Sequence, residues 1–274
     1  MFSVVIPLYN KELSIRNTIL SVLEQSYQNF EIIVVNDGSA DGSVDAVKTI
    51  KDERVRLIHQ ENQGVSAARN RGIKEAKYKW IAFLDGDDVW GSNHLEEIVK
   101  MMGIFPNEKV YVTSFEYSDK RKMYRHERND SIFKIENYFK EAINEQLICT
   151  NIIVVHAQCF VEVGAFNINL NRGEDLDLWT RLARRYDIVK SSNITAIYRV
   201  EAENRSSLTF DINKSRIFHY DFSDSSSRDE YVYHEKQILR VLRSFLKKKD
   251  FQNFLLLLRK HIRYISLINL LKSK

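Results

Sequence analysis

The sequence of 274 residues contains little cysteine and little proline, with two residues of each. Cys149 and Cys159 lie ten residues apart with no metal-ligand spacing around them, so two reduced core thiols are favoured over a disulfide. No apolar run approaches the ~20 residues that span a bilayer. The N-terminus lacks the basic segment and the cleavage site of a secretory signal. These absences predict a cytoplasmic protein. The glycine patterns of dinucleotide-binding and P-loop enzymes are also missing.

The chain carries a small net charge, +4, but its distribution is uneven. Residues 236–274 contain eleven lysines and arginines and one acidic residue, whereas the rest contains 30 basic and 36 acidic residues. Because this segment is also rich in leucine, isoleucine and phenylalanine, it predicts helices that lie on an anionic membrane surface. The alternative is a helical hairpin packed on protein. Nucleic acid binding is not expected, since the rest of the chain is acidic and no recognition motif is present.

Apolar residues alternate between strand-like and helix-like spacing over residues 1–104. The pattern predicts strands at 3–7, 30–35, 54–59 and 79–84, and helices near 15–23, 43–51, 64–77 and 93–102. Four alternations of strand and helix are typical of an α/β fold with a doubly wound, mostly parallel sheet. The later pattern is less regular. It predicts strands at 110–117, 122–125 and 194–200, and helices at 135–147 and from Glu174 onward.

Polar residues follow three of these strands at the point where each strand ends. They are Pro7-Leu8-Tyr9-Asn10, Asn36-Asp37-Gly38 and Asp85-Gly86-Asp87-Asp88, and the loop after the third strand leads to Arg69. Ligands of open parallel sheets collect at these carboxyl ends. We therefore expect these residues to share one binding site. The alternatives are an Asx turn at Asp37, an ordinary surface aromatic at Tyr9 and an exposed helix residue at Arg69.

The segment Asp85-Gly86-Asp87 has the residue types of a divalent cation site. An isolated Asp-x-Asp is expected by chance roughly once in a chain of this size, and Asp175-Leu176-Asp177 is a second copy. The first copy directly follows a buried apolar run, and Gly86 permits close approach of backbone and ligand. Carboxylates at a strand end repel one another unless a cation lies between them, and Mg²⁺ or Mn²⁺ prefers oxygen ligands. A solvated aspartate-rich turn is the alternative.

Glu174 and Asp175 are the next candidates. Acidic residues in the first turn of a helix are favoured by the helix dipole, which accounts for them without any function. A carboxylate that stays ionised at neutral pH is also able to accept a proton. Sequence periodicity does not reveal whether either residue faces the predicted metal site.

Five segments in this order, SVVIPLYN, VVNDGSADGS, NQGVSAARNRGI, WIAFLDGDDVW and GEDLDLWTRL, resemble glycosyltransferase family two over residues 2–200. The resemblance implies a GT-A fold and inverting transfer from a nucleotide sugar, usually a UDP-sugar. It implies that Pro7, Tyr9 and Asp37 surround the nucleoside and that Arg69 lies near the base or diphosphate. Asp85 would contact ribose or metal beside Gly86, and Asp87 would be the principal metal ligand. Asp175 would be the general base, with Glu174 beside it.

The resemblance also implies a division of the chain. Residues 1–205 would form the catalytic domain, with a nucleotide-sugar-binding half (1–104) and an acceptor half (105–205). A linker over 206–230 and a basic helical extension over 231–274 would follow. We expect an enzyme of bacterial surface polysaccharide or glycolipid assembly, peripheral at the inner face of the membrane, with a glycan or lipid-linked acceptor.

Two features depart from the family pattern. Asp37 is the sole carboxylate at the end of its strand, where many relatives have two, and the Q-x-x-R-W signature of processive synthases is absent. Transfer of one sugar per encounter is therefore expected. Two other functions fit the sequence less well. A sugar-phosphate nucleotidyltransferase needs a glycine-rich, arginine-containing loop that PLYNKE does not provide. A non-catalytic nucleotide-sugar-binding scaffold would not need the intact Asp85, Asp87 and Asp175.

Overall fold

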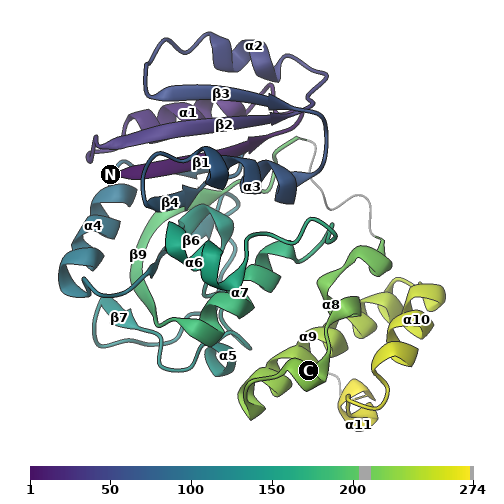
Figure 1. Ribbon diagram of the computed structural model, residues 1–274. Coiled ribbons are helices and arrows are strands. Elements are labelled where there is room, and N and C mark those ends of the chain that lie inside the picture. The colour runs from purple at the N-terminus through teal and green to yellow at the C-terminus, as the bar shows by residue number, and fades with distance from the viewer. Residues whose placement is uncertain (204–210, 272–274) are drawn as a thin grey trace.

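The structure, a computed structural model, describes residues 1–203 and 211–271 of the chain. These residues contain a nine-stranded sheet in the order β3-β2-β1-β4-β8-β6-β9-β5, with β7 paired to β9. Figure 1 shows helices on both faces of this sheet and a further group of helices near the C-terminus. The predicted α/β class with a C-terminal helical appendage is therefore confirmed.

The N-terminal half contains the parallel part of the sheet. Strands β1 (Phe2–Leu8), β2 (Phe30–Asp37), β3 (Val55–Gln60) and β4 (Trp80–Phe83) pair in parallel and alternate with helices α1 (Ile15–Leu23), α2 (Ser43–Lys48) and α3 (Val65–Glu75). Helices cover both faces of β1 and β2, so these strands are buried along their whole length. Gly72 lets α3 lie against β1, because a Cβ atom there would be 2.2 Å from Cγ1 of Val5. All four predicted strands are present.

The second half of the sheet is mixed. Strand β6 (Val110–Tyr117) is parallel to β9 (Ile188–Tyr198) and antiparallel to β8 (Ile153–His156), and β8 joins the two halves by pairing with β4. The short strands β5 (Val89–Trp90) and β7 (Ile132–Lys134) run antiparallel to β9. The helices here are α4 (His94–Ile104), α5 (Tyr138–Glu141), η1 (Thr150–Ile152), α6 (Ala157–Val163) and α7 (Glu174–Arg185). Parallel pairing therefore dominates only the N-terminal half.

Three predictions for this half are wrong. The polar segment 122–125 is not a strand, because it has no partner in the sheet. The helix expected over 135–147 shrinks to α5, after which the chain turns and brings Leu147 and Ile148 into the core. Strand β9 begins earlier than expected, at Ile188, because its first residues pair with β6 and β7. Strands β5, β7 and β8 and helix α6 were not predicted, since each is too short to show a clear period.

The C-terminal helices form a core of their own. Helices α9 (Arg228–Lys247), α10 (Phe251–His261) and α11 (Leu267–Leu271) share buried apolar residues with the segment before them. That segment contains η3 (Ile212–Lys214), α8 (Arg216–His219) and η4 (Phe222–Asp224), where a linker was predicted, and residues 206–210 lie outside the described residues. Helix α9 starts at Arg228, where the Ser227 hydroxyl accepts the N–H of Glu230 at 3.1 Å. The proposed division into domains stays a prediction.

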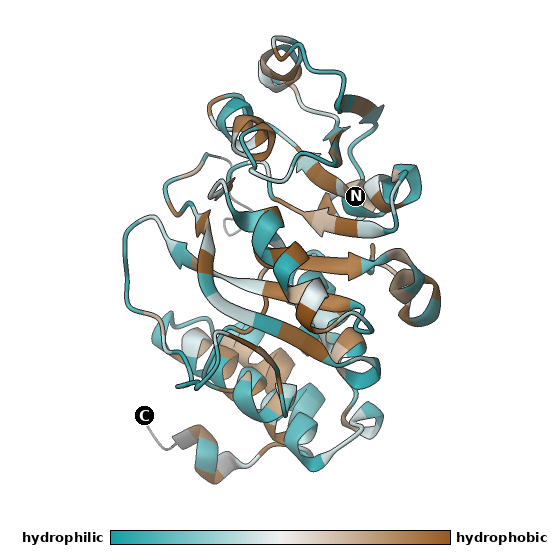
Figure 2. Ribbon diagram, turned by 90° about the vertical axis from the view of Figure 1, so that its left-hand side faces the viewer, coloured by the Kyte–Doolittle hydropathy of each residue, from teal (hydrophilic) through white to brown (hydrophobic). Residues whose placement is uncertain are grey.

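The core follows the apolar pattern of the strands. Figure 2 shows hydrophobic residues concentrated along the central strands, with hydrophilic residues on the outer faces of the helices. Cys149 and Cys159 are buried free thiols, as predicted, and burial raises the pKa of Cys159 to about 11. Among the described helices, none is both long enough and apolar enough to cross a bilayer.

Candidate active site

The carboxyl ends of β1, β2 and β4 border a cavity of about 410 Å³, which we call the strand-end cavity. Its lining contains every residue predicted from the sequence to bind the nucleotide sugar or the metal: Pro7, Tyr9, Asp37, Arg69, Asp85, Gly86 and Asp87. The expectation that these residues share one cavity at the strand ends is therefore met. Whether each residue binds what was assigned to it stays a prediction.

Asp37 uses its carboxylate to hold a neighbouring loop. Its Oδ1 accepts hydrogen bonds from Nε2 of Gln60 at 2.8 Å and the N–H of Gln63 at 2.9 Å, and its Oδ2 accepts the N–H of Gly64 at 2.8 Å. Gly64 has a φ of +89°, which glycine adopts without strain. Asp37 does not form the Asx turn considered for it; the neighbouring Asn36 binds the turn through its Oδ1, which accepts the N–H of Ser39. Asp37 thus shapes one wall of the strand-end cavity.

Asp85 and Asp87 each pair with a basic side chain. Oδ1 of Asp85 is 2.6 Å from Arg69, and Oδ2 of Asp87 is 2.6 Å from Nζ of Lys11. Burial and the charge of Asp85 raise the pKa of Asp87, and Lys11 opposes this shift. Gly86 lies between them where a Cβ atom would be 3.1 Å from the carbonyl oxygen of Pro7. The described residues contain no group of three or more His, Cys, Asp or Glu side chains that would hold a metal.

The donor set nevertheless fits a hard cation that receives further ligands from its substrate. Both carboxylates supply oxygen atoms, which Mg²⁺ and Mn²⁺ prefer, and such ions commonly keep water and substrate phosphate as ligands. Burial and the repulsion from Asp85 both raise the pKa of Asp87, and a bound cation would favour its ionised form. Lys11 occupies one oxygen of Asp87 and would compete with the ion for it.

Asp88 has a different role from its neighbours. It is buried, its Oδ1 accepts the N–H of Arg199 at 2.9 Å, and its Oδ2 accepts Nδ2 of Asn151 at 2.8 Å. Burial, reinforced by Asp85 and Asp87, raises the pKa of Asp88 well above its usual range. Asp88 therefore ties the end of β4 to the end of β9 and does not line the strand-end cavity.

A second cavity of about 410 Å³ adjoins the first at the start of α7, and we call it the helix-start cavity. The two share Arg69, Asp85, Asn171, Glu174 and Tyr198 as lining residues. Arg69 crosses the shared wall: it is 2.6 Å from Asp85 on one side and 3.1 Å from Glu174 on the other. The N-cap of α7 is Gly173, with a φ of +76° that places the first turn of the helix at this wall.

Asp175 lines the helix-start cavity. Burial raises the pKa of Asp175 to about 6, Glu174 adds to the shift, and Arg69 opposes it. Oδ1 of Asp175 also accepts the N–H of Leu176 at 2.7 Å. A carboxylate with this pKa is ionised at neutral pH and basic enough to take a proton there. Asp177, from the same Asp-x-Asp, points elsewhere and pairs with Arg181 at 2.7 Å.

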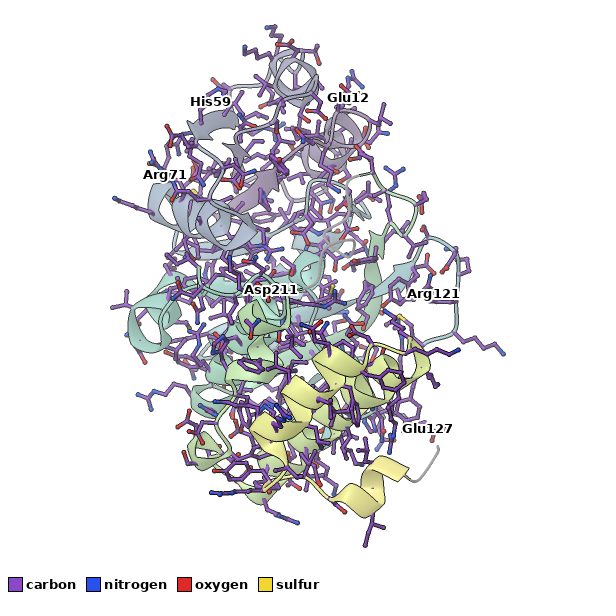
Figure 3. All side chains as sticks on the ribbon, turned by 90° about the vertical axis from the view of Figure 1, so that its right-hand side faces the viewer. Glu12, His59, Arg71, Arg121, Glu127 and Asp211 are labelled. Atoms are coloured by element: carbon purple, nitrogen blue, oxygen red, sulfur yellow. The ribbon has the colours of Figure 1, made fainter. Side chains whose placement is uncertain are left out.

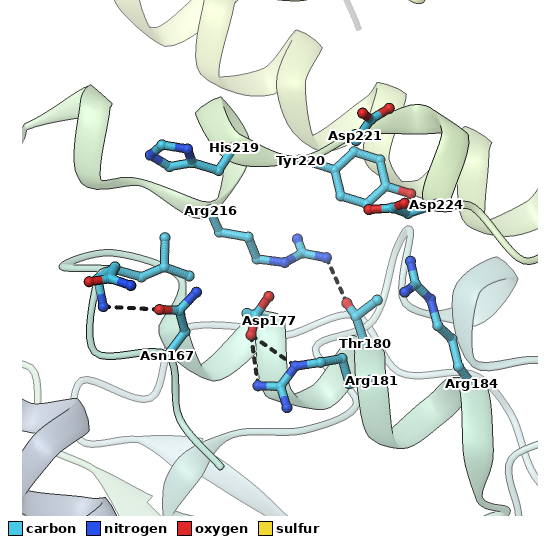
Figure 4. Close-up of a pocket in the computed structure, with 12 residues that line it drawn as sticks. Asn167, Asp177, Thr180, Arg181, Arg184, Arg216, His219, Tyr220, Asp221 and Asp224 are labelled. Carbon is cyan, nitrogen blue, oxygen red and sulfur yellow. Dashed lines mark hydrogen bonds and ion pairs between the residues drawn. The ribbon is translucent and has the colours of Figure 1, made fainter. Parts of the chain in front are cut away.

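A third cavity, of about 450 Å³, lies between α7 and the segment from α8 to η4 (Figure 4). We call it the seam cavity. Two of its basic lining residues have partners nearby: Arg216 donates to the Thr180 hydroxyl at 2.6 Å, and Arg184 pairs with Glu230 outside the cavity at 2.6 Å. Beside it, residues 171–172 and 214–216 form a parallel bridge through two backbone hydrogen bonds of 2.8 and 3.0 Å. The C-terminal helices therefore hold the residues that immediately precede Glu174.

Two residues near the strand-end cavity were missed from the sequence. Lys11 follows the first strand closely, and the strand-end rule that selected Tyr9 also covers it. Glu203 gave no local signal, because it comes from a distant part of the chain. Its carboxylate accepts the N–H and the hydroxyl of Ser14 at the start of α1, at 3.1 and 2.9 Å, and its carbonyl oxygen accepts Lys11.

The sheet, the two adjoining cavities and the acidic residues on their walls define the class of GT-A glycosyltransferases. The chain belongs to glycosyl transferase family 2, whose family model matches residues 3–164. The match contains all the predicted strand-end residues and ends before Glu174 and Asp175.

Relatives among curated proteins match part of the chain. A protein named "uncharacterized glycosyltransferase" from Rickettsia bellii is 34% identical over 204 residues, which are 74% of this chain and 29% of that protein. The UDP-Glc:alpha-D-GlcNAc-diphosphoundecaprenol beta-1,3-glucosyltransferase WfgD of Escherichia coli is 41% identical over 103 residues, which are 37% of this chain and 41% of that protein. The matches thus span well under half of these relatives' own lengths.

Solved structures resemble nearly the whole chain. The structure of S. aureus TarS 1–349 in complex with UDP-GlcNAc superposes with a TM-score of 0.67 and 17% sequence identity, covering 96% of this chain and 73% of that one. The same fragment in complex with UDP gives a TM-score of 0.64 at 15% identity, covering 97% of this chain and 92% of that one. At this level of identity the likeness establishes the fold, and it extends over the C-terminal helices.

Proposed function

We propose that this protein is an inverting glycosyltransferase that moves a sugar from a UDP-sugar to a hydroxyl acceptor. The observation that carries the proposal is the shared wall of the two cavities, where Arg69 joins Asp85 to Glu174 and Asp175 lies beyond it. A donor in the strand-end cavity and an acceptor in the helix-start cavity would meet at this wall. The uridine nucleotide is supported by two similar structures, which are complexes with UDP-GlcNAc and with UDP.

The proposed reaction is a single displacement. The acceptor oxygen forms a bond to the anomeric carbon of the sugar, while the bond from that carbon to the diphosphate oxygen breaks on the opposite face. Asp175 takes the proton of the acceptor hydroxyl, and the bonding electron pair leaves with the nucleoside diphosphate. Pro7, Tyr9 and Asp37 would border the nucleoside, and Asp85 and Gly86 the ribose and diphosphate. Glu174 would shape the acceptor side.

We also propose that Asp87, with Asp85, holds Mn²⁺ or Mg²⁺ beside the donor diphosphate. The bound ion would offset the negative charge of the leaving group. The support is the pair of oxygen donors at the end of β4 and the raised pKa of Asp87.

The acceptor is proposed to be a glycan or lipid-linked sugar of a bacterial surface polysaccharide or glycolipid. The name of the E. coli relative, which describes transfer to a diphosphoundecaprenol-linked sugar, supports this class. Such an acceptor would place the protein in the cytoplasm, peripheral on the inner face of the membrane.

The test compares two substitutions on one helix. UDP release is measured with UDP-glucose or UDP-N-acetylglucosamine and a GlcNAc-diphospholipid acceptor, in the presence of Mn²⁺. Asp175→Asn is expected to lower kcat by about 10²–10⁴-fold because the general base is lost. Asp177→Asn is the matched control, since Asp177 lies in the same helix but pairs with Arg181.

Each other outcome has a definite meaning. A wild-type rate in Asp175→Asn would show that Asp175 is not the base. If the wild-type protein binds UDP with Mn²⁺ but releases none from any donor, the non-catalytic nucleotide-sugar binder would replace the enzyme.

A further inference from the structure

Helix α10 and the residues after it expose apolar side chains that the C-terminal core does not use. Phe251, Leu255, Ile262 and Ile268 are 59%, 48%, 47% and 68% exposed. Phe251, Leu255 and Ile262 follow each other at intervals of four and seven residues, so they share one stripe of the helix and its last turn. Another stripe, with Leu257 and His261, is buried against the neighbouring helices. Helix α10 therefore has two apolar stripes, and the part of the chain that the structure describes covers one of them.

Basic residues surround this exposed stripe. Lys247–Lys249 precede α10, Arg259 lies in its last turn, and Arg263 follows it. All five side chains are exposed. Among the described residues, none of these five forms an ion pair with a carboxylate. Asp250, the one acidic residue of segment 236–274, caps α10 by accepting the N–H and Nδ2 of Asn253. Over residues 1–203 and 211–271, no carboxylate is thus paired with the positive charges of this surface.

We propose that this surface, the α10 face (Phe251, Leu255, Ile262 and Ile268 with Lys247–Lys249, Arg259 and Arg263), docks on an anionic lipid bilayer. Apolar side chains enter the boundary between headgroups and acyl chains, and lysine and arginine bind the anionic headgroups. Figure 3 shows α10 in the outer layer of the molecule, in front of the remaining chain.

Other occupants fit this surface less well. A second copy would bring five like charges against five, which costs free energy at a symmetric interface. A nucleic acid would bind the charges but leave the exposed phenylalanine, leucine and isoleucine without apolar partners. A bilayer with anionic headgroups satisfies both kinds of side chain at once.

The sequence predicts membrane contact for the whole segment 236–274, and the structure limits the exposed apolar side chains of this proposal to α10 and the residues after it. Helix α9 buries its own apolar stripe, including Ile238, Leu239 and Leu242, and therefore anchors α10 to the protein. The predicted alternatives, packing on protein and contact with a membrane, apply to different stripes of the same extension. The inference rests on the proposed function, because docking of the α10 face would bring the enzyme to a lipid-linked acceptor.

The experiment measures sedimentation of the full chain with vesicles. Vesicles of phosphatidylcholine alone are compared with vesicles that also contain phosphatidylglycerol. The wild-type chain is expected to bind the anionic vesicles. Lys247→Gln, Lys248→Gln and Lys249→Gln together are expected to weaken binding about a hundredfold, since each basic residue near such a surface contributes about fivefold. Phe251→Ser with Leu255→Ser is expected to weaken it by about tenfold or more.

The control changes the same charge at the opposite side of the molecule. Lys48→Gln, Lys51→Gln and Lys74→Gln remove three exposed lysines at or near α2 and α3, and binding is expected to stay at the wild-type level. The proposal is overturned if wild type ignores anionic vesicles, or if the control weakens binding as much as the α10 variants. It is also overturned if the lysine variant instead loses a wild-type dimer or binding to duplex DNA. UDP release in detergent is measured in parallel: its absence with intact vesicle binding would contradict the proposed function alone.

Discussion

Arg69 is the residue through which the two cavities are electrostatically connected. It is buried, contacts Asp85 and Glu174, and its guanidinium lies 5.2 Å from the ring of Phe166. Its charge also lowers the pKa of the nearby Asp175. A substitution at Arg69 is therefore expected to change the pKa of Asp175, the proposed base, through charge alone.

This connection predicts the pH dependence of the reaction. The proposed base acts as a carboxylate and has a pKa of about 6, so kcat/KM is expected to fall as pH drops below about 6 and to level off above it. Arg69→Gln removes a charge that lowers this pKa, so the falling limb is expected to move to higher pH. The profile is measured by UDP release from pH 4.5 to 8.5. Asp177→Asn should leave the limb in place, and an unshifted limb in Arg69→Gln would refute the coupling.

Lys11 makes a second prediction at this scale. Its ammonium neutralises Asp87, so Lys11→Met leaves the partly buried Asp87 carboxylate without its counter-charge, whereas Asp85 keeps Arg69. In the absence of metal the variant is expected to lose about 2 kcal/mol of unfolding free energy. Because Lys11 competes with the ion for Oδ2 of Asp87, Mn²⁺ is expected to stabilise the variant more than the wild type. Thermal unfolding with and without Mn²⁺ measures both effects, and an equal Mn²⁺ shift in the two proteins would argue against Asp87 as the ligand.

The sequence located the residues of the site better than it located their contacts. Tyr9, Asp37, Asp85 and Asp87 were found because strand ends are predictable from local apolar patterns. The partners of Asp37 and the link from Arg69 to Glu174 join residues far apart in the chain, and no local pattern encodes such distances. The contact of Glu203 with Ser14 at the start of α1 also joins distant residues, so it was not predictable from the sequence.

At the scale of elements, the seam between α7 and the C-terminal helices supports the start of α7. Glu230, at the first turn of α9, is buried and pairs with Arg184 near the end of α7. Backbone bonds between 171–172 and 214–216 hold the other end of the helix. The position of Glu174 and Asp175 thus depends on helices that the family match does not reach.

Glu230 gives a stability prediction with a defined pH window. Burial alone would raise its pKa, but hydrogen bonds from His234, Arg184 and Ser226 outweigh it and lower the pKa to about 2. The stabilisation is therefore present above the unfolded value of about 4.3 and is lost as pH falls toward 2. Glu230→Gln is expected to cost about 3 kcal/mol at pH 7 and much less at pH 3.

Urea unfolding of both proteins at the two pH values measures this difference. Arg184→Met and the double variant complete a cycle that isolates the pair, and the coupling is expected to shrink at pH 3 as well. A cost that does not change with pH would show that shape at this position matters more than charge.

Helices and strands differ in how well local apolar patterns in the sequence predict them. The parallel strands of the first half are continuous apolar runs between amphipathic helices, so both length and period were readable. Strand β8 is four residues long and is stabilised by β4 and β6 on either side, which are distant in sequence. The segment 122–125 had the composition of a strand but no such neighbours.

At the scale of the whole molecule, segments that are far apart in the chain meet at the strand-end cavity. The strand-end cavity, where the donor is proposed to bind, is lined by residues from the ends of β1 and β2, from α3, from the loop after β4, from the start of α7 and from the end of β9. Ligand binding there would restrain several elements at once. Binding of a donor is therefore expected to stabilise the whole fold.

A panel of nucleotide sugars tests this expectation and identifies the donor. A ligand at 100 times its dissociation constant stabilises the folded state by about 2.7 kcal/mol, which for a chain of this size raises Tm by roughly 5–10 °C. With Mn²⁺ present, one UDP-sugar is expected to give this shift, and ADP- and GDP-sugars a smaller one. Asp87→Asn is expected to abolish the part of the shift that depends on Mn²⁺ while leaving a smaller part from contacts to the nucleoside. If ADP- or GDP-sugars stabilise more strongly than every UDP-sugar, the proposed donor class is wrong, although the strand-end cavity would still be the binding site.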